Sequence, residues 1–262
     1  AALPSDLIVL FRSHATPAVK AGVPAPALNT RDRKKAAFLS WNIRCAMPAK
    51  YASATRHLID KGSVGSNGVM TSKPPNLSRA YSLSSPEDSK RLYADWAESY
   101  DQDFVGEQGY ILHLQVARHF VASGGQGPVL DVGAGTGVCG AALRELGISE
   151  IEATDISADM LKVAAAKDVY RSLFTADLLQ GLPVADNSYG GIVSSGTFTT
   201  GHVGPQAIDE LARVAKPGGL IALSINAKHF GSAGFAAKFE TLNGSIYDLS
   251  LTNVRIYEAT TK

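Results

Sequence analysis

The chain has little cysteine and no long apolar run among its 262 residues. Its two cysteines, Cys45 and Cys139, imply no disulfide framework and fit a reducing, cytoplasmic compartment. The longest apolar stretch near the start, residues 7–11, is far shorter than the roughly 18 residues of a membrane-spanning helix. No membrane association is therefore expected. Hydrophobic residues make up 45% of the chain, which is typical of a globular protein with a sizeable core.

Acidic residues are scarce at the beginning of the chain. Residues 1–69 hold ten Lys or Arg and three Asp or Glu, a balance of +7. Because the whole chain carries +1, the other 193 residues carry −6. A basic surface able to follow a nucleic-acid backbone is not expected from this larger, acidic part.

Residues 1–69 also lack a sustained helical or strand period, and prolines and glycines interrupt them. We predict that residues 1–84 are a disordered or non-native extension, either a transit-peptide-like leader or translated sequence upstream of a start at Met70. Ser85-Pro86-Glu87-Asp88 is typical of a helix start. Residues 85–262 are expected to form one domain, in which residues 85–122 are a helical lid.

From residue 128 onward, strand-like runs alternate with helical periods. Strands are predicted at 129–132, 150–154, 170–175, 191–195 and 220–225, and helices at 138–146, 158–167, 205–215 and 234–242. These units predict an α/β, Rossmann-like, doubly wound and mostly parallel sheet, whose ligand lies at the carboxyl ends of the strands. Residues 246–251 and 254–259 are expected to add an antiparallel edge hairpin. The chain ends soon after it, so we expect a truncated C-terminus.

A glycine-rich loop, Asp131-Val-Gly133-Ala-Gly135-Thr-Gly137, joins the first strand of this alternation to its helix. Glycines allow a tight turn and a close approach of backbone to ligand, and the helix start offers free N–H groups. Gly135-Thr-Gly137-Val-Cys-Gly140 also satisfies the dinucleotide pattern G-x-G-x-x-G. On the loop alone, an NAD(P)-dependent oxidoreductase remains open.

Three acids favour a different ligand. Asp131 precedes the glycines, where its charge would repel a pyrophosphate and attract an ammonium group. Asp155 follows the second strand of the alternation, at the position of a ribose-binding acid, and Asp177 follows the third, within reach of an adenine amino group. Together they indicate a site for an adenosyl ligand that carries an amino-acid group.

Residues 129–137 resemble the first motif of Rossmann-like methyltransferases that use S-adenosylmethionine. Ala153-Thr-Asp155-Ile-Ser157 resembles their second motif, and residues 211–219 resemble the segment before their fifth strand. The similarity covers about residues 85–262. More narrowly, residues 93–101 and 195–205 are similar to the methyltransferase-like group named after the Williams–Beuren syndrome region.

This resemblance implies S-adenosylmethionine as the cofactor and assigns a role to individual residues. Asp131 would reach the methionine amino group through water, and Asp155 would accept both ribose hydroxyls. The remaining cofactor contacts would be Gly133, Gly135 and Gly137 along the methionyl chain, Ile156 and Met160 on the adenine faces, Asp177 and the Leu178 N–H on the adenine edge, Ser195 and Gly196 beside the sulfonium, and Tyr100 as a lid.

Methyl transfer needs mainly an aligned acceptor and exclusion of water, so neither a catalytic triad nor a metal site is expected. Thr199 and His202 are the nearest polar candidates for contact with an acceptor. For His202, a hydrogen bond that fixes its loop is an equal alternative. His113 and His119 are expected on the partly exposed surface of a helix.

We therefore expect an S-adenosylmethionine-dependent methyltransferase that acts on an unidentified small molecule or protein side chain, as a monomer or homodimer. An NAD(P)-dependent oxidoreductase and a non-catalytic cofactor-binding protein are the alternatives.

Overall fold

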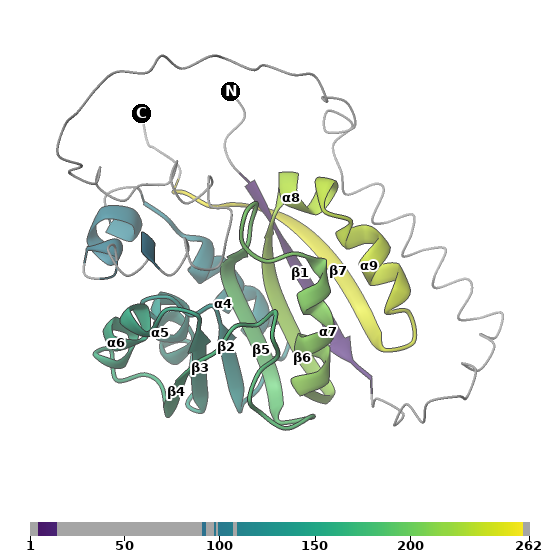
Figure 1. Ribbon diagram of the computed structural model, residues 1–262, viewed down its shortest axis with the longest axis horizontal. Helices are drawn as coiled ribbons and strands as arrows, with labels where there is room; N and C mark the ends of the chain where they lie inside the picture. Colours follow the sequence, from purple (N-terminus) through teal and green to yellow (C-terminus); the bar gives the residue numbers. More distant parts are fainter. Residues whose placement is uncertain (1–4, 15–90, 93–96, 98, 107–108, 259–262) are drawn as a thin grey trace, which may run out of the picture.

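The structure, a computed structural model, describes residues 5–14, 91–92, 97, 99–106 and 109–258. A seven-stranded sheet with the order β4-β3-β2-β5-β6-β1-β7 lies between two layers of helices (Figure 1). Within these ranges, none of the helices combines the length and apolarity that crossing a membrane requires.

Five strands run parallel and alternate with helices along the chain. They are β2 (Val129–Val132), β3 (Ile151–Asp155), β4 (Ser172–Thr175), β5 (Tyr189–Phe198) and β6 (Ala215–Asn226). The chain moves from β2 outward through β3 and β4, then returns to β5 on the other side of β2. The carboxyl ends of β2 and β5 thus form the switch point of the sheet, where ligands of such folds bind. The predicted α/β class with a mostly parallel sheet is confirmed.

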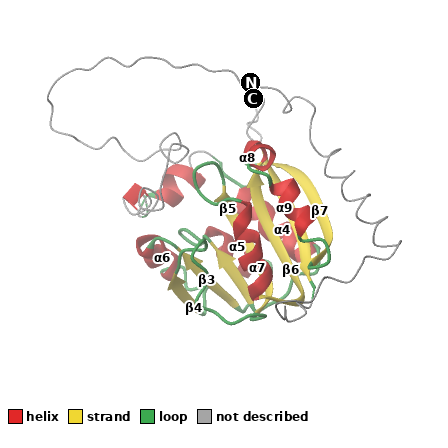
Figure 2. Ribbon diagram, turned by 45° about the vertical axis from the view of Figure 1, so that its right-hand side comes forward, coloured by secondary structure: helices red, strands yellow, loops and turns green. Residues whose placement is uncertain are grey.

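Helices cover both faces of the sheet, as Figure 2 shows. One face packs against α4 (Leu112–Ala122), α5 (Val138–Glu145) and α6 (Ala158–Ala165). The other packs against the short turn η3 (Pro205–Ala207), α7 (Ile208–Val214), α8 (Ala227–Ser232) and α9 (Phe235–Thr241). Phe120 and Leu143 are fully buried on the first face, and Phe230 and Phe235 are buried on the second. Helix α8 had no counterpart in the sequence prediction.

The strand β1 (Ser5–Ser13) lies inside the sheet, antiparallel to β6 on one side and to β7 (Ile246–Arg255) on the other. Leu7, Val9 and Phe11 face the α7–α9 layer, and Ile8 and Leu10 face the α4 layer. The prediction that residues 1–84 lie outside the fold is wrong for this strand. A strand buried on both faces is a continuous apolar run without alternation, so its period is invisible in the sequence. Residues 15–84 lie outside the described residues, as does most of the helix predicted from residue 85.

The edge of the sheet also differs from the prediction. A single strand, β7, spans both runs that were expected to form a hairpin, and its antiparallel partner is β1. The expected hairpin is therefore wrong, although an antiparallel element at this side of a mostly parallel sheet is present. Because β1 is antiparallel to both neighbours, β7 runs in the same direction as β2–β6. Residues 259–262 lie outside the described residues.

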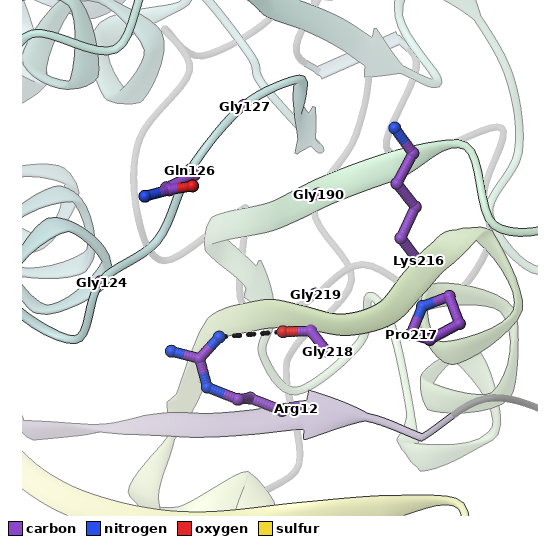
Figure 3. Close-up of a pocket in the computed structure, with 9 residues that line it drawn as sticks. All are labelled: Arg12, Gly124, Gln126, Gly127, Gly190, Lys216, Pro217, Gly218 and Gly219. Carbon is purple, nitrogen blue, oxygen red and sulfur yellow. Dashed lines mark hydrogen bonds between the residues drawn. The ribbon is translucent and has the colours of Figure 1, made fainter.

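A recess of about 200 Å³ opens at the amino ends of β5 and β6 (Figure 3). Arg12 lines the recess and donates hydrogen bonds to the carbonyls of Gly218 (2.9 Å) and Ser123 (2.8 Å). The guanidinium thus links β1 to the start of β6 and to the end of α4. This recess lies at the edge of the sheet opposite to the glycine loop, so it is not part of the site considered below.

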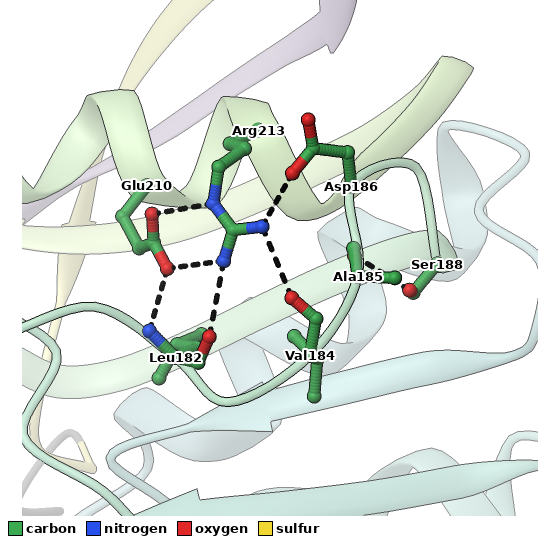
Figure 4. A network of polar contacts seen from close by, with 7 residues as sticks. All are labelled: Leu182, Val184, Ala185, Asp186, Ser188, Glu210 and Arg213. Carbon is green, nitrogen blue, oxygen red and sulfur yellow. Dashed lines mark hydrogen bonds and ion pairs between the residues drawn. The ribbon is translucent and has the colours of Figure 1, made fainter.

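A polar network holds the connection between β4 and β5 against α7 (Figure 4). Arg213 pairs with Glu210 (2.6 Å) and Asp186 (2.6 Å) and donates to the carbonyls of Leu182 (3.1 Å) and Val184 (3.0 Å). The backbone N–H of Leu182 donates to Glu210 in return. One arginine therefore satisfies carbonyls that have no strand or helix partner.

Candidate functional site

The glycine loop is held at the carboxyl end of β2 by the neighbouring strand. The N–H groups of Gly133 and Ala134 both donate to the carbonyl of Thr154 at the end of β3, at 2.8 and 3.1 Å. Gly133, Gly135 and Gly137 have φ angles of +67°, +56° and +86°, which other residues rarely adopt. The backbone conformation of the loop is therefore by itself a sufficient reason for these glycines.

The glycines differ in what surrounds them. A side chain at Gly133 would collide with Thr197, and one at Gly137 would meet Tyr170 and Ala164. Among the described residues, no atom lies within 4 Å of the place where a side chain at Gly135 would begin. Among the three, Gly135 is thus the position at which the backbone faces open space and a ligand can approach.

Asp131 is fully buried beneath the loop. Its Oδ2 accepts a 2.7 Å hydrogen bond from the hydroxyl of Tyr170, whereas its Oδ1 has no partner among the described residues. Burial raises the pKa of Asp131 to about 7. A buried carboxylate with one unused oxygen fits a cationic group that is reached through water. The contact with a methionine amino group stays a prediction.

Asp155 ends β3 beside the loop. Its Oδ2 accepts from the N–H of Gly135 and its Oδ1 from the N–H of Ser157, both at 2.8 Å. Burial raises the pKa of Asp155. A carboxylate has about four acceptor positions, so room remains for ribose hydroxyls. Ile156 is half-buried, but Met160 is only 2% exposed and packs inside the protein.

Asp177 and Leu178 follow β4. The Oδ1 of Asp177 accepts from the N–H of Leu179 at 2.9 Å, which fixes the turn, and the side chain of Leu178 is buried in the core. Asp155 and Asp177 therefore stand at the carboxyl ends of adjacent strands, as the sequence predicted.

The end of β5 borders the same loop. The Ser194 hydroxyl donates to the carbonyl of Val132 at 2.8 Å, and the Gly196 N–H donates to the Ser224 hydroxyl at 2.8 Å. The buried Oγ of Ser195 has no partner. A side chain at Gly196 would lie 3.1 Å from the hydroxyl of Tyr110. The structure thus brings Ser195 and Gly196 beside the glycine loop.

The segment before α4 is fastened to the loop by Asp101, which sequence reasoning missed. Asp101 begins the short π-helix η2 (Asp101–Gly106) and accepts from the Thr136 hydroxyl (2.5 Å) and from Lys167 (2.5 Å). Tyr100 precedes it and packs, half-buried, against the α4 layer. The sequence did offer one indication of Asp101: it directly follows Tyr100 within residues 93–101, which carry the narrower family resemblance.

His113 lies on α4 and is only 7% exposed, so the prediction of a surface position is wrong. Its ring stacks on Tyr110, with centroids 6.0 Å apart, and no residue that the structure describes bonds to its Nδ1. Burial lowers the pKa of His113 to about 4, although Asp101 acts in the opposite direction. The imidazole is therefore neutral at physiological pH.

Thr199 and His202 lie in the loop after β5. The Thr199 hydroxyl and His202 Nδ1 are 2.8 Å apart, and the same nitrogen lies 3.4 Å from the Thr200 carbonyl. Burial lowers the pKa of His202, and His229 nearby adds to this shift. These contacts are those that a loop-fixing role predicts.

In the part of the chain that the structure describes, four buried side-chain polar atoms have no hydrogen-bond partner. They are His113 Nδ1, Asp131 Oδ1, Thr154 Oγ1 and Ser195 Oγ. Three of them lie at the carboxyl ends of β2, β3 and β5, and the fourth lies at the start of α4. Unpaired buried polar atoms are costly, so their gathering at one edge indicates a site for a polar ligand. No cluster of His, Cys, Asp or Glu suited to a metal ion occurs among the described residues.

The segment that carries the glycine loop and the neighbouring strand ends is similar to known proteins. Residues 130–223 match the family model described as a methyltransferase domain. Methyltransferase-like protein 27 of Homo sapiens is 33% identical over 141 residues, which cover 51% of this chain and 56% of that protein. Malonyl-(acyl-carrier protein) O-methyltransferase of Buchnera aphidicola subsp. Baizongia pistaciae (strain Bp) is 32% identical over 165 residues (61% and 64%). Demethylmenaquinone methyltransferase of Renibacterium salmoninarum is 30% identical over 152 residues (56% and 62%).

The matched segment contains the glycine loop, Asp155, Asp177 and the end of β5. Residues 130–223 therefore match a methyltransferase domain, which confirms the broad resemblance drawn from the sequence. The resemblance to the Williams–Beuren group stays a prediction. The chain spans less than two thirds of the length of these three relatives, and the acceptors in their names are properties of those proteins.

Proposed function

We propose that this chain binds S-adenosylmethionine at the carboxyl edge of the sheet and transfers its methyl group to a small molecule or a protein side chain. The observation that carries the proposal is the set of four unpartnered buried polar atoms around the glycine loop. Such atoms fit a ligand with several polar groups, and the open space at Gly135 fits its approach to the backbone.

The residues that would hold the cofactor are spread along the strand ends. Asp155 would hold the ribose, and Asp177 with the Leu178 N–H would hold the adenine edge. Ile156 would cover an adenine face, whereas Met160 would support that face from inside the protein. Gly133, Gly135 and Gly137 would follow the methionyl chain, and Ser195 and Gly196 would border the sulfur, with Tyr100 above.

When bound, the cofactor supplies a sulfonium methyl group that is ready for in-line displacement. The residues of this chain would then orient an acceptor along the line from the methyl group and exclude water from the cleft. Tyr110 lies beside Gly196, and the loop with Thr199 and His202 follows β5. An acceptor would enter the cleft between these two elements.

Equilibrium binding and methyl transfer test the proposal. We expect S-adenosylhomocysteine to bind and NADH and NADPH not to bind, and labelled methyl to pass from S-adenosylmethionine to a member of a metabolite and peptide panel. Binding of the nicotinamide cofactors alone would contradict the proposal in favour of an oxidoreductase. Cofactor binding without any transfer would favour a non-catalytic protein.

A variant makes the binding test specific to the site. Asp155→Ala should weaken S-adenosylhomocysteine by about 1.5–3 kcal/mol for each charged hydrogen bond lost. Asp209→Ala serves as a control, because that carboxylate is 60% exposed and lies on α7. Equal affinity of both variants and the parent protein would refute the ribose assignment.

A further inference from the structure

We propose that His113 binds the carboxylate of the cofactor's amino-acid group and becomes protonated as it does so, opposite Asp131, which serves the ammonium of the same group. This inference rests on the proposed function. It adds a residue that selects ligands carrying an amino-acid group over ligands that end at the sulfur.

The position of His113 follows from the path of α4 along β5. The ring of Phe120 lies 2.3 Å from where a side chain at Gly191 would begin, and the Tyr110 hydroxyl lies 3.1 Å from that point at Gly196. As the chain advances from Tyr110 to Phe120 through α4, its contacts move back along β5 from Gly196 to Gly191. Helix α4 therefore runs antiparallel to β5. His113 lies seven residues before Phe120, about 10 Å along the helix, which is about three strand residues beyond Gly191 and near the level of Ser194 and Ser195.

Contacts also place His113 beside the glycine loop. Its carbonyl lies 4.0 Å from the Sγ of Cys139, in the first turn of α5 directly after the loop. Asp101, which accepts from Thr136 in the loop, is close enough to act electrostatically on the imidazole. His113 thus lies between Asp101 of η2, the first turn of α5 and the end of β5.

The charges around this place leave the imidazole as the group suited to an anion. Asp101, from η2, has its two oxygens occupied by Thr136 and Lys167. From α5, the Cys139 thiol is kept neutral because burial raises its pKa. From β2, Asp131 keeps one oxygen unpartnered. An amino-acid group carries one cation and one anion, and the unpartnered atoms of Asp131 and His113 match them in turn.

Protonation follows from the arrival of the carboxylate. Without a ligand, burial keeps His113 neutral, with a pKa of about 4. A carboxylate within hydrogen-bond distance favours the imidazolium, so binding draws a proton from solvent onto the ring and no covalent bond changes. The affinity for a ligand with this carboxylate should therefore fall as the pH rises, because the proton becomes harder to obtain.

Calorimetric titration of the full chain with two ligands tests the proposal. S-adenosylhomocysteine carries the amino-acid group, and 5′-methylthioadenosine has the same adenosine and sulfur without it. We expect tighter binding at about pH 6 than at about pH 8 for the first ligand only. Proton uptake by this ligand is expected at about pH 8, because Asp131, with a pKa of about 7, is then already ionised and has no proton to release when it meets the ammonium. Identical pH dependence of the two ligands would overturn the proposal.

Variants of the histidine separate its role from a structural one. His113→Leu should weaken S-adenosylhomocysteine by about tenfold to a hundredfold and change 5′-methylthioadenosine by less than about twofold. His113→Gln should also abolish proton uptake, and it provides the comparison if the leucine variant does not fold. His119→Leu is the matched control, because its ring bonds to the Gln115 carbonyl on the same helix.

The outcomes also distinguish this inference from the proposed function. Equal weakening of both ligands by His113→Leu, or no weakening, would overturn the role of His113 and leave the cofactor site intact. Failure of the parent protein to bind either ligand would overturn the cofactor site, and the role of His113 with it.

Discussion

The hydroxyl of Tyr170 donates a 2.7 Å hydrogen bond to Oδ2 of Asp131 and fills the space beneath the glycine loop. A side chain at Gly140 would come within 2.2 Å of that hydroxyl oxygen, and one at Gly137 within 2.9 Å of the ring. Two glycines of the G-x-G-x-x-G pattern therefore make room for a tyrosine. The pattern reflects packing at Gly137 and Gly140 and open space at Gly135.

We expect Tyr170→Phe to reduce stability at about pH 8 by about 1–2 kcal/mol, because a buried carboxylate loses its only side-chain donor. The loss should shrink below about pH 5, where the carboxyl group is protonated in both variants. Urea unfolding at the two pH values measures it. Tyr247→Phe, on the edge strand β7, is the control, and an equal loss at both pH values would contradict the link to Asp131.

Asp6 should make the protein less stable as the pH rises from about 4 to about 7. Burial raises the pKa of Asp6 to about 7, so in this range the folded state holds a proton that the unfolded state has lost. The free energy of unfolding therefore falls with increasing pH and levels off above about pH 7. Asp131 has a raised pKa of about 7 as well and adds to the same slope.

Asp6→Asn should accordingly stabilise the protein by about 1–3 kcal/mol at about pH 8 and have little effect at about pH 4. Chemical denaturation across this pH range is the measurement. A stabilisation that is the same at every pH would show that the charge of Asp6 is not the cause.

Gly135 and Gly147 offer a matched pair for separating backbone strain from ligand contact. Both have positive φ angles, +56° and +92°, and in the part of the chain that the structure describes no atom lies within 4 Å of a new Cβ at either position. Replacement by Ala should cost each about 1 kcal/mol of stability, by thermal or urea unfolding. Only Gly135→Ala should also weaken S-adenosylhomocysteine. Equal affinities of the two variants for S-adenosylhomocysteine would show that the ligand does not bind at the glycine loop.

Arg213→Ala should destabilise the protein by about 2–3 kcal/mol, because the carbonyls of Leu182 and Val184 and two carboxylates lose the hydrogen bonds of the guanidinium. Arg213→Lys should restore only part of the lost stability, since an ammonium lacks the planar guanidinium fork that bonds the carboxylates and the carbonyls at the same time. Lys238→Ala, which breaks a single pair with Asp209, should cost less than about 1 kcal/mol in the same denaturation assay.

The sequence predicted the β2–β6 units because each is encoded locally, by a short apolar run next to a helical period. It failed for β1, since the partners that make Leu7 to Phe11 a strand lie more than 200 residues away in the chain. Asp155 and Asp177 could be predicted from their places after strands. His113 could not, because a polar residue on a helix is usually solvated and burial here depends on η2, α5 and β5 together.

The place of β1 sets an order of events during synthesis. Ser13 ends β1, and Ala215 begins the strand on which β1 lies. At about 5–20 residues per second, ribosomes need roughly 10–40 s to make the intervening chain. During that time the apolar stretch 7–11 has no partner strand and must be shielded from aggregation, by a chaperone or by transient burial. Among the strands that the structure describes, the first to be synthesised, β1, therefore pairs only with the last two, β6 and β7.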